Sequence, residues 1–151
     1  MFQNDEDKML EAGPSWHGTA LGWLKSYDRY VIRLPALSER FCGIKMFSNI
    51  LIYSAYLPTS GQDDLFLETL SQLSFDVESN IDGIETVIIG LDSNESVKST
   101  KRRSTAMKMF CSKFKLKSII SGSKPTFHHN NQIAESQIDH ILFFLRIQNW
   151  T

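Results

Sequence analysis

The sequence predicts a mixed α/β domain in which amphipathic helices cover β-strands. The segment 50–56 is almost entirely apolar, as is typical of a strand that is buried on both faces. A segment that begins at Asp63 repeats its apolar residues at helical spacing on one face: Leu65, Phe66, Leu70, Leu73 and Val77. A second short apolar run, 85–90, follows this helix and predicts another buried strand. A strand, a helix and a strand in this order favour a sheet with helices packed on it.

The first part of the chain predicts strands alone. Residues 1–15 are acidic and polar, and we expect a loose lead-in there, with one domain over residues 16–151. Short runs that are rich in β-branched and aromatic residues predict three further strands, at 18–24, 30–34 and 39–47. Asp63 and Asp64 then favour the beginning of the first helix, because carboxylates in a first turn interact well with the helix dipole.

The last part of the chain adds a helix and more strands. A second amphipathic helix is predicted from one set of apolar residues: Ala106, Met107, Met109, Phe110 and Phe114. A strand is expected at 116–120, and a strand pair at 125–129 and 136–144 is joined by a polar loop. The expected order is therefore ββββ-α-β-α-β-ββ.

Composition excludes several classes of protein. The chain has 151 residues, of which 42% are hydrophobic and 22% charged, which is ordinary for one soluble globular domain or less. No apolar run is long enough for a membrane span, and the polar start does not resemble a signal peptide. Cys42 and Cys111 have no metal-binding spacing and are typical of reduced thiols, so we expect an intracellular protein. The net charge of −1 means that any contact with nucleic acid depends on a local basic cluster.

The most informative segment joins a buried strand to Asp92 and Asn94. Ligands of open α/β sheets gather beyond the carboxyl ends of the strands, where these two side chains lie. Asp92 could hold a metal ion or accept a proton from water, and the Asn94 amide could donate to a phosphate oxygen. A turn in which an aspartate side chain caps the backbone explains the same pair without any ligand.

Two other segments carry isolated polar residues at strand positions. Tyr56 ends the apolar strand at 50–56, before a turn at Pro58, and a structural role explains it equally well. Asp139 interrupts an apolar strand, where a buried carboxylate would need a partner such as a histidine or an arginine. A position at a strand edge that faces water is the alternative for Asp139.

A basic cluster follows the Asp92 loop directly. Four cations make up this cluster: Lys98, Lys101, Arg102 and Arg103. Lysine and arginine pair with phosphates, although a solvated first helical turn would have the same composition. His128 and His129 have no cysteine or acidic residue at suitable spacing, so a zinc site is not favoured there.

These segments occur in one order, which resembles the endonuclease/exonuclease/phosphatase superfamily. The order is Y-L-P at 56–58, I-I-G-L-D-S-N at 88–94, P-T-F at 125–127 and S-Q-I-D-H-I-L at 136–142. Members include deoxyribonuclease I and the apurinic/apyrimidinic endonucleases. The sequence resembles most closely the endonuclease domains of LINE-type retrotransposons, which pair a Thr-Phe motif with a following S-x-I-D-H/Y-I strand. The resemblance implies a partial two-sheet β-sandwich flanked by helices, with the deoxyribonuclease I-like four-layer architecture.

The resemblance also implies roles for single residues. Asp92 resembles the aspartate that positions or deprotonates the attacking water and is a candidate metal ligand, and Asn94 resembles the asparagine that holds the scissile phosphate. Tyr56 resembles the tyrosine that contacts this phosphate. Asp139 resembles the aspartate that orients the catalytic histidine, and Thr126 resembles a threonine near bound DNA.

The sequence departs from the family pattern at three places. Leu91 is an extra residue in the family's G-D-x-N motif. No residue before Gly18 matches the family's early asparagine or its metal-binding glutamate, and no strand with S-D-H supplies the catalytic histidine before Thr151. His140 lies in the Asp139 motif and is not that histidine. We therefore expect a domain of this family that is incomplete at both ends.

The functional expectation follows from this resemblance. In its full-length form such a domain nicks DNA with Mg²⁺ or Mn²⁺, and a nuclear location is compatible with that substrate. Two alternatives stay open: a catalytically inactive remnant that binds nucleic acid or nothing, and a phosphatase of small phosphoesters. We expect four side chains to meet in one cleft, with the basic cluster beside it: Tyr56, Asp92, Asn94 and Asp139. No motif indicates an oligomeric state.

Overall fold

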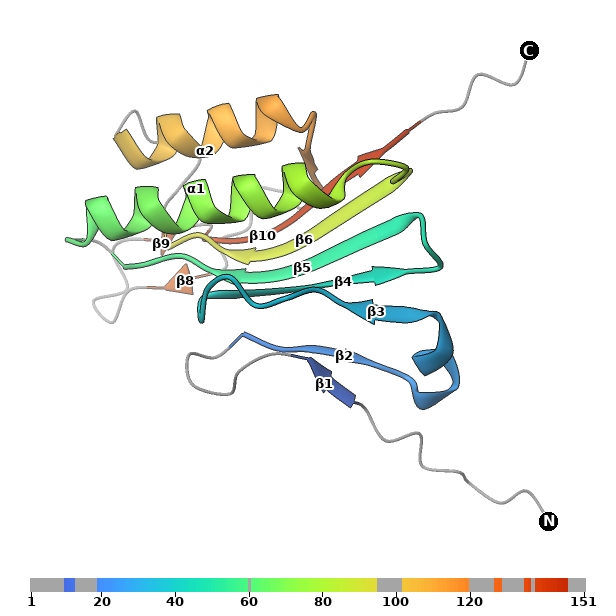
Figure 1. Ribbon diagram of the computed structural model, residues 1–151. Coiled ribbons are helices and arrows are strands. Elements are labelled where there is room, and N and C mark those ends of the chain that lie inside the picture. Colours follow the sequence, from blue (N-terminus) through green and yellow to red (C-terminus); the bar gives the residue numbers. More distant parts are fainter. Residues whose placement is uncertain are drawn as a thin grey trace.

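The computed structural model describes residues 10–12, 19–59, 61–94, 102–119, 127–128, 135–136 and 138–146. These residues form ten strands, a 3-10 helix and two α-helices, in the following order (Figure 1): β1 Leu10–Ala12, β2 Leu21–Trp23, η1 Lys25–Tyr30, β3 Val31–Arg33, β4 Phe41–Met46, β5 Ile50–Tyr56, α1 Asp63–Asn80, β6 Thr86–Asp92, α2 Arg102–Lys113, β7 Lys117–Ser118, β8 Phe127–His128, β9 Glu135–Ser136 and β10 Asp139–Leu145.

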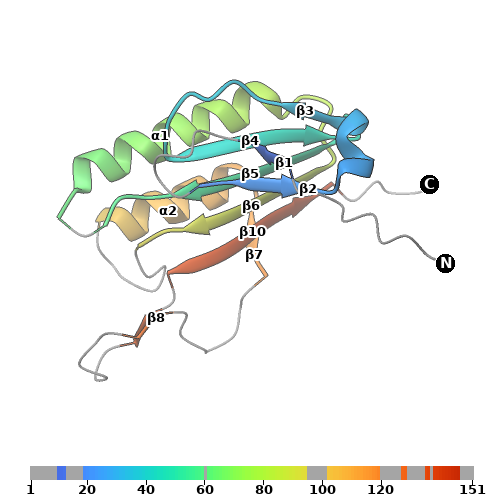
Figure 2. The ribbon, with the colours of Figure 1, turned by 90° about the horizontal axis from the view of Figure 1, so that it is seen from below.

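A six-stranded mixed sheet is the centre of the fold. Its strand order is β3-β4-β5-β6-β10-β7, and only the β5–β6 pair is parallel. Both α-helices cover one face of this sheet, and the small β1–β2 sheet lies on the other (Figures 1 and 2). The mixed α/β architecture that the sequence predicts, with helices packed on a sheet, is confirmed.

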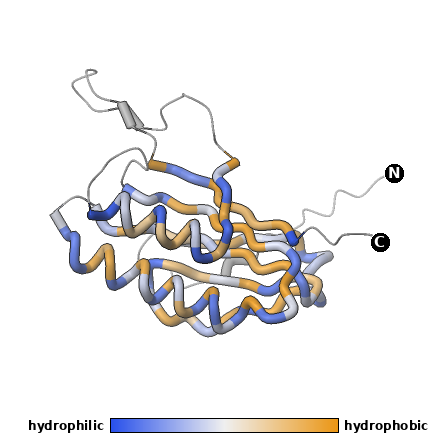
Figure 3. The backbone as a smooth tube through the Cα atoms, turned by 90° about the horizontal axis from the view of Figure 1, so that it is seen from above, coloured by the Kyte–Doolittle hydropathy of each residue, from blue (hydrophilic) through white to orange (hydrophobic). Residues whose placement is uncertain are grey.

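The main core lies between the helices and the sheet. Every second residue of β5 and β6 is buried, and these residues pack against one face of each helix. Seen from the helix side, hydrophobic strand segments lie beneath the two helices (Figure 3). The parallel β5–β6 pair requires a crossover connection, which α1 provides. This crossover brings the carboxyl ends of β5 and β6 to the same end of the sheet.

The two helices have opposite charge. Helix α1 contains acidic residues and no basic ones, whereas α2 contains basic residues and no acidic ones. Three ion pairs join the helices from end to end: Arg102–Asp64 (3.6 Å), Arg103–Asp63 (3.7 Å) and Lys113–Glu78 (2.9 Å). The two pairs made by Arg102 and Lys113 are exposed and contribute little stability individually, whereas the Arg103 side chain is buried. Because two of the three pairs join the first turns and the third joins the last turns, they favour the parallel alignment of the helices.

The other face of the sheet has a smaller apolar cluster. Trp23 of β2 is buried against Ile44 of β4, with Leu21, Val31, Met46 and Ile52 around them. Trp23 also donates a hydrogen bond from Nε1 to Asp28 of η1 (3.3 Å). Strand β4 is therefore buried on both faces along its first four residues.

Three local expectations differ from the structure. Part of the segment expected as a loose lead-in forms β1, which pairs with β2. The segment 25–30 is a 3-10 helix, which the sequence analysis did not anticipate. The expected pair of strands near the end is only partly right, since β8 pairs with β9 while β10 joins the main sheet beside β6. The pairing of β10 with β6 joins residues that are distant in sequence, so local sequence patterns could not predict it.

A buried polar contact ties α1 to the sheet. Tyr53 of β5 donates a hydrogen bond from its hydroxyl to Oδ2 of Asp76 in α1 (2.8 Å), and Asn80 donates to Oδ1 of Asp76 (3.2 Å). Burial raises the pKa of the Asp76 carboxyl, and the two hydrogen bonds lower it in part. The Tyr53 ring lies so close to Gly43 of β4 that a Cβ there would meet it at 2.5 Å. Only glycine therefore fits at position 43 without displacing Tyr53.

The first prediction concerns this contact. Tyr53→Phe removes one of the two hydrogen bonds to a buried carboxylate, so we expect a loss of about 1–3 kcal/mol in the free energy of unfolding. Urea unfolding followed by circular dichroism measures this loss. Tyr27→Phe, at a tyrosine that is 42% exposed, is the matched control and should change the free energy by less than about 0.5 kcal/mol. Equal effects of the two substitutions would contradict the assignment.

The second prediction concerns the pH dependence of stability. Because the pKa of Asp76 is higher in the folded state than its ordinary value, the folded chain binds more protons than the unfolded chain between these two pKa values. Stability should therefore fall as pH rises through this interval, and Asp76→Asn should remove that part of the slope. Unfolding measured in urea across mildly acidic pH checks this, and an unchanged slope in Asp76→Asn would contradict it.

Candidate functional site

The sheet brings three of the predicted site residues into one row. In the parallel β5–β6 pair, Tyr56 lies opposite Asp92. In the antiparallel β6–β10 pair, Asp92 lies opposite Asp139. All three residues therefore lie at the carboxyl end of β5 and β6, although they come from three separate parts of the sequence. We call these residues the polar row (Figure 2 shows the strands that carry it).

The three side chains project from one face of the sheet. Directly paired residues lie on the same face, and the neighbours Ala55, Leu91 and His140 are buried. Ala55 and Leu91 belong to the core beneath the helices, so the polar row lies on the face opposite the helices. Adjacent strands are about 4.8 Å apart, which places the three Cα atoms within about 10 Å of each other.

Asp92 and Asp139 form an especially close pair. Ser93 donates its backbone N–H to the Ile138 carbonyl (2.7 Å), which makes Ser93 and Ile138 a hydrogen-bonded pair of the antiparallel ladder. The next pair, Asp92 and Asp139, is then of the non-hydrogen-bonded kind, in which Cα atoms are about 4.5 Å apart and side chains are closest. The Ser93 hydroxyl also donates to the Ile138 carbonyl (2.8 Å) and fixes this register further.

The electrostatics of Asp92 reflect this position. Burial is the main cause that raises the pKa of its carboxyl, and the neighbouring Asp139 carboxylate raises it further. The Asn94 backbone N–H and the charge of His140 lower the pKa in part. Two carboxylates that face one site repel each other, and the raised pKa of Asp92 includes this repulsion in addition to the larger effect of burial.

Asn94 holds the loop that follows β6. Its backbone N–H donates to Oδ1 of Asp92 (3.1 Å), so the capped turn that was the alternative interpretation of this pair is present. Its side-chain amide donates to the Leu57 carbonyl (2.7 Å), and the Leu57 N–H donates to the Asp92 carbonyl (2.8 Å). Asn94 adopts a φ of 47°, in the left-handed region that asparagine tolerates better than most residues. One amide proton of Asn94 is thus used structurally, and the second is the one that could reach a phosphate oxygen.

Asp139 differs from its expected environment. The apolar neighbours of Asp139 in the sequence predict a buried carboxylate, but Asp139 is exposed at the first position of β10. The alternative, a strand-end aspartate facing water, describes it better. His140 is buried on the opposite face of the strand, so it does not share the face of the polar row.

The basic cluster is only partly described. Lys98 and Lys101 lie outside the described residues, as does Thr126. Arg102 is exposed near Asp64, at the same end of the sheet as the polar row. The expected surface role of Arg103 is not supported, because this residue is only 3% exposed. Its guanidinium stacks on the Phe66 ring (4.1 Å to the centroid) and donates to the Pro58 carbonyl.

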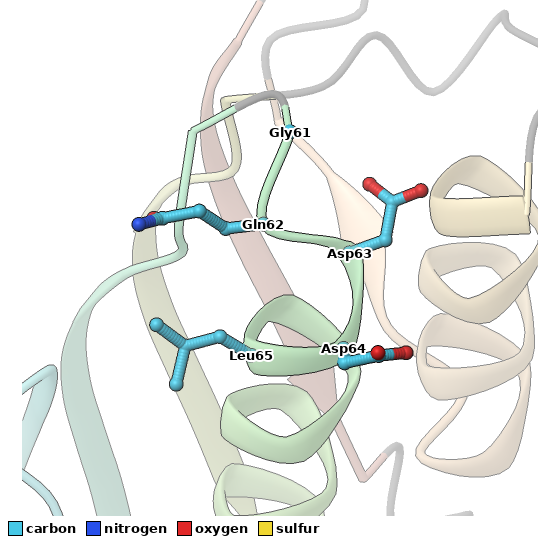
Figure 4. A pocket seen from close by; sticks show the side chains of 5 residues that line it. All are labelled: Gly61, Gln62, Asp63, Asp64 and Leu65. Carbon is cyan, nitrogen blue, oxygen red and sulfur yellow. The ribbon is translucent and has the colours of Figure 1, made fainter.

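A hollow of about 500 Å³ lies at the beginning of α1, lined by residues 61–65. Asp63 and Asp64 point to the side on which α2 lies, and Gln62 and Leu65 point away from it (Figure 4). The two carboxylates are the partners of Arg103 and Arg102. No residue of the polar row lines this hollow.

Arg40 is a neighbour of the row that the sequence analysis missed. The Tyr56 N–H donates to the Arg40 carbonyl (2.8 Å), one residue beyond the end of the β4–β5 ladder. The Arg40 guanidinium lies 5.9 Å from the centre of the Tyr56 ring. The only sequence signal was a cation at the beginning of a predicted strand, and its position opposite Tyr56 depends on the register of β4 against β5.

The polar row has two candidate metal ligands. Within the described residues, no group of three histidine, cysteine, aspartate or glutamate side chains could hold a metal ion. Mg²⁺, however, is commonly held by one or two carboxylates, with water and substrate phosphate oxygens as the remaining ligands. The adjacent carboxylates of Asp92 and Asp139 fit that pattern.

The described residues also contain no helix that is long and apolar enough to cross a membrane.

Comparison with known proteins shows what the fold is similar to. No model of a protein family and no curated protein matches the sequence. Among solved structures, the endonuclease domain of TRAS1, a telomere-specific non-LTR retrotransposon, aligns with a TM-score of 0.62 at 17% identity, over 89% of this chain and 65% of that one. The human Nocturnin catalytic domain aligns with a TM-score of 0.54 at 13% identity, over 90% and 60%. The Bacteroides thetaiotaomicron mannosyl-6-phosphatase Bt3783 aligns with a TM-score of 0.50 at 14% identity, over 90% and 62%.

These similarities establish the fold. The chain shares the deoxyribonuclease I-like fold of these three structures, as the sequence resemblance implied. It spans less than two thirds of the length of each of the three structures. The roles of Tyr56, Asp92, Asn94 and Asp139 stay predictions.

The third prediction concerns the ionisation of Asp92. Nuclear magnetic resonance titration of its side-chain carboxyl carbon should give a midpoint above the ordinary value of about 3.9, because burial and Asp139 both disfavour the carboxylate. Asp139→Asn removes the charge and should lower this midpoint. Glu68→Gln, at an exposed carboxylate on the helix side, is the control and should leave it unchanged. A midpoint that is insensitive to Asp139→Asn would contradict the pairing of the two carboxylates.

Proposed function

We propose that this chain is part of a divalent-metal-dependent phosphodiesterase domain that cleaves DNA. One observation carries the proposal: a shared strand register places Tyr56, Asp92 and Asp139 in one row, at the end of the sheet where ligands of open α/β sheets gather. A turn capped by an aspartate is a local structure. It does not by itself explain why a tyrosine and a second aspartate from distant parts of the sequence lie beside Asp92. The shared fold with a retrotransposon endonuclease domain supports the same proposal.

The row supplies groups that phosphodiester hydrolysis needs. Asp92 is suited to orient a water molecule or accept its proton, because its raised pKa brings it nearer to the working range of a general base. The Tyr56 hydroxyl and the second amide proton of Asn94 can donate to phosphate oxygens. Asp92 and Asp139 would hold Mg²⁺ or Mn²⁺. Such an ion, when bound, would stabilise the charge that develops on the phosphate.

An exposed arginine on the helix side of the sheet and two lysines that precede it in the sequence support DNA as the substrate. Arg102 is exposed at the same end of the sheet, and the neighbouring Lys98 and Lys101 add charge in the sequence. Lysine and arginine supply the salt-dependent part of nucleic-acid affinity. The two alternatives, an inactive nucleic-acid-binding remnant and a small-substrate phosphatase, make different predictions in the experiments below.

We expect only traces of cleavage by the 151-residue chain. Its sequence contains no match to the family's metal-binding glutamate or catalytic histidine. The loss of one such group typically lowers the rate by about a hundredfold to a thousandfold, and losses of groups that work together do not simply multiply. Metal binding is therefore a more direct test than turnover.

The fourth prediction uses Mn²⁺ as a probe. Mn²⁺ should broaden the nuclear magnetic resonance signals of Tyr56, Asp92 and Asp139 before those of other residues, and Asp92→Asn should abolish this selective broadening. Glu78→Gln, at an exposed carboxylate that pairs with Lys113, is the matched control and should leave it intact. Selective broadening elsewhere, or none, would contradict the proposed metal site.

A plasmid-nicking assay with Mg²⁺ accompanies the binding experiment. Trace nicking that disappears in Asp92→Asn would support the endonuclease proposal. Nicking that persists in Asp92→Asn would show that a different site or a contaminating nuclease is responsible. Hydrolysis of a small phosphate monoester without nicking would favour the phosphatase alternative, and binding of DNA without any cleavage would favour the inactive remnant.

A further inference from the structure

Arg40 extends the polar row by one residue. The Tyr56 N–H donates to its carbonyl, so Arg40 lies opposite Tyr56, one residue before the antiparallel β4–β5 ladder begins. Directly opposed residues of a hydrogen-bonded antiparallel pair lie on the same face, with Cα atoms about 5.5 Å apart. Four side chains therefore follow each other in a fixed order, the first from the turn before β4 and the others from β5, β6 and β10: Arg40, Tyr56, Asp92 and Asp139.

Two contacts position Arg40 beside Tyr56, one through its side chain and one through its backbone. The guanidinium lies 5.9 Å from the centre of the Tyr56 ring, within the range of a cation–π contact, which leaves its N–H groups for hydrogen bonds. The Arg40 backbone N–H donates to the hydroxyl of Ser38 (3.2 Å), which fixes the turn before the strand. Arg40 is half-buried, and no ion pair within the described residues neutralises it.

Charge is distributed unevenly along the row. Two carboxylates lie at one end and a guanidinium at the other, with Tyr56 between them. On its helix side, Arg40 lines a hollow of about 280 Å³ together with Glu39 and Glu68. Carboxylates on that side disfavour an anion there, so an anion would reach Arg40 from the Tyr56 side. The Cα atoms of Arg40 and Asp92 are about 10 Å apart, which is more than one phosphate group can bridge.

We propose that Arg40 and the face of Tyr56 form an anion subsite for a second phosphate of the substrate, next to the phosphate that Asp92 faces. This inference rests on the proposed function and specifies its substrate as a chain of phosphodiesters. Each strand of duplex DNA carries one charge about every 3.4 Å along the helix axis, so neighbouring phosphates of one strand can occupy both positions. A phosphate monoester can occupy only one of them. Arg40 is a binding residue here and takes no part in bond cleavage.

The test measures binding of a short, fluorescein-labelled single-stranded oligonucleotide by anisotropy, in Mg²⁺ and at several salt concentrations. Arg40→Gln should weaken binding about tenfold and should reduce the slope of log K against log salt by about one, because one phosphate contact is lost. The salt slope is informative because a purely structural role of Arg40 would not change it by one charge. Arg29→Gln is the matched control, since Arg29 also stacks on a tyrosine, Tyr30, but just before β3, at the opposite end of the sheet. It should leave both quantities unchanged.

Arg40→Lys keeps the charge but cannot form two parallel hydrogen bonds to one phosphate. The Arg40→Lys variant should bind the oligonucleotide severalfold more weakly, with an unchanged salt slope. If Arg40→Gln folds poorly, the affinity of Arg40→Lys is the measurement that tests the subsite. Unchanged affinity and slope in the Arg40 variants, with selective Mn²⁺ broadening at Asp92 intact, would overturn the subsite and leave the proposed function standing. Weaker binding by Arg40→Gln in a protein without that broadening would support the subsite and contradict the metal-dependent function. An absence of salt-dependent binding by the unsubstituted chain would overturn the subsite.

Discussion

The pairing of β6 on both sides fixes the candidate site. β6 is parallel to β5 and antiparallel to β10, so its register decides which residues lie beside Asp92. Side chains alternate between the two faces of a strand, so a shift of one residue would turn Asp92 into the helix-covered core and expose Leu91. Val87, Ile89 and Leu91 are all buried in that core, and their burial therefore opposes the shift. The hydrophobic contacts that hold the sheet together are also the ones that keep the carboxylate on the open face.

The helix layer is attached to this sheet by apolar packing and by one buried polar contact. The Tyr53 hydroxyl and the Asp76 carboxylate meet inside the core, and Gly43 leaves room for the Tyr53 ring. Tyr53 and Tyr56 belong to the same strand, but Tyr53 faces the helices while Tyr56 lies in the polar row. The two tyrosines thus have separate roles: Tyr53 positions α1, and Tyr56 belongs to the candidate site. Arg103 supports the same layer, since it joins the beginning of α2 to Phe66 of α1 and to the loop after β5.

The sequence predicted the fold and three members of the polar row, because the necessary signals are local. The apolar runs that become β5 and β6 and the helical spacing after Asp63 identify the crossover unit without any long-range information. Arg40 could not be found in this way, since its position beside Tyr56 depends on the pairing of two strands. Arg103 was assigned to the surface because arginine is usually exposed, and only the fold places an aromatic ring and a carbonyl next to it. For Asp92 and Asn94, a capped turn and a functional site were the two interpretations, and they are compatible. The turn that follows β6 also holds both side chains at the end of this strand.

The position of β10 has a consequence for the order of folding. Tyr56 and Asp92 belong to a crossover unit that is continuous in sequence, whereas Asp139 enters the sheet only after α2 and β7. Contacts between residues distant in sequence require a larger loss of chain entropy before they form, so we expect β10 to join the sheet after β5, α1 and β6 have associated. β7 pairs with Leu142 and Phe143, and the Ile119 N–H donates to the Ile141 carbonyl, so within the described residues only Asp139 and His140 of β10 pair with β6 alone. Such a segment can open locally while the core stays folded. Detachment of β10 would separate the two carboxylates, so the population of this open state would limit the fraction of molecules that have a complete pair.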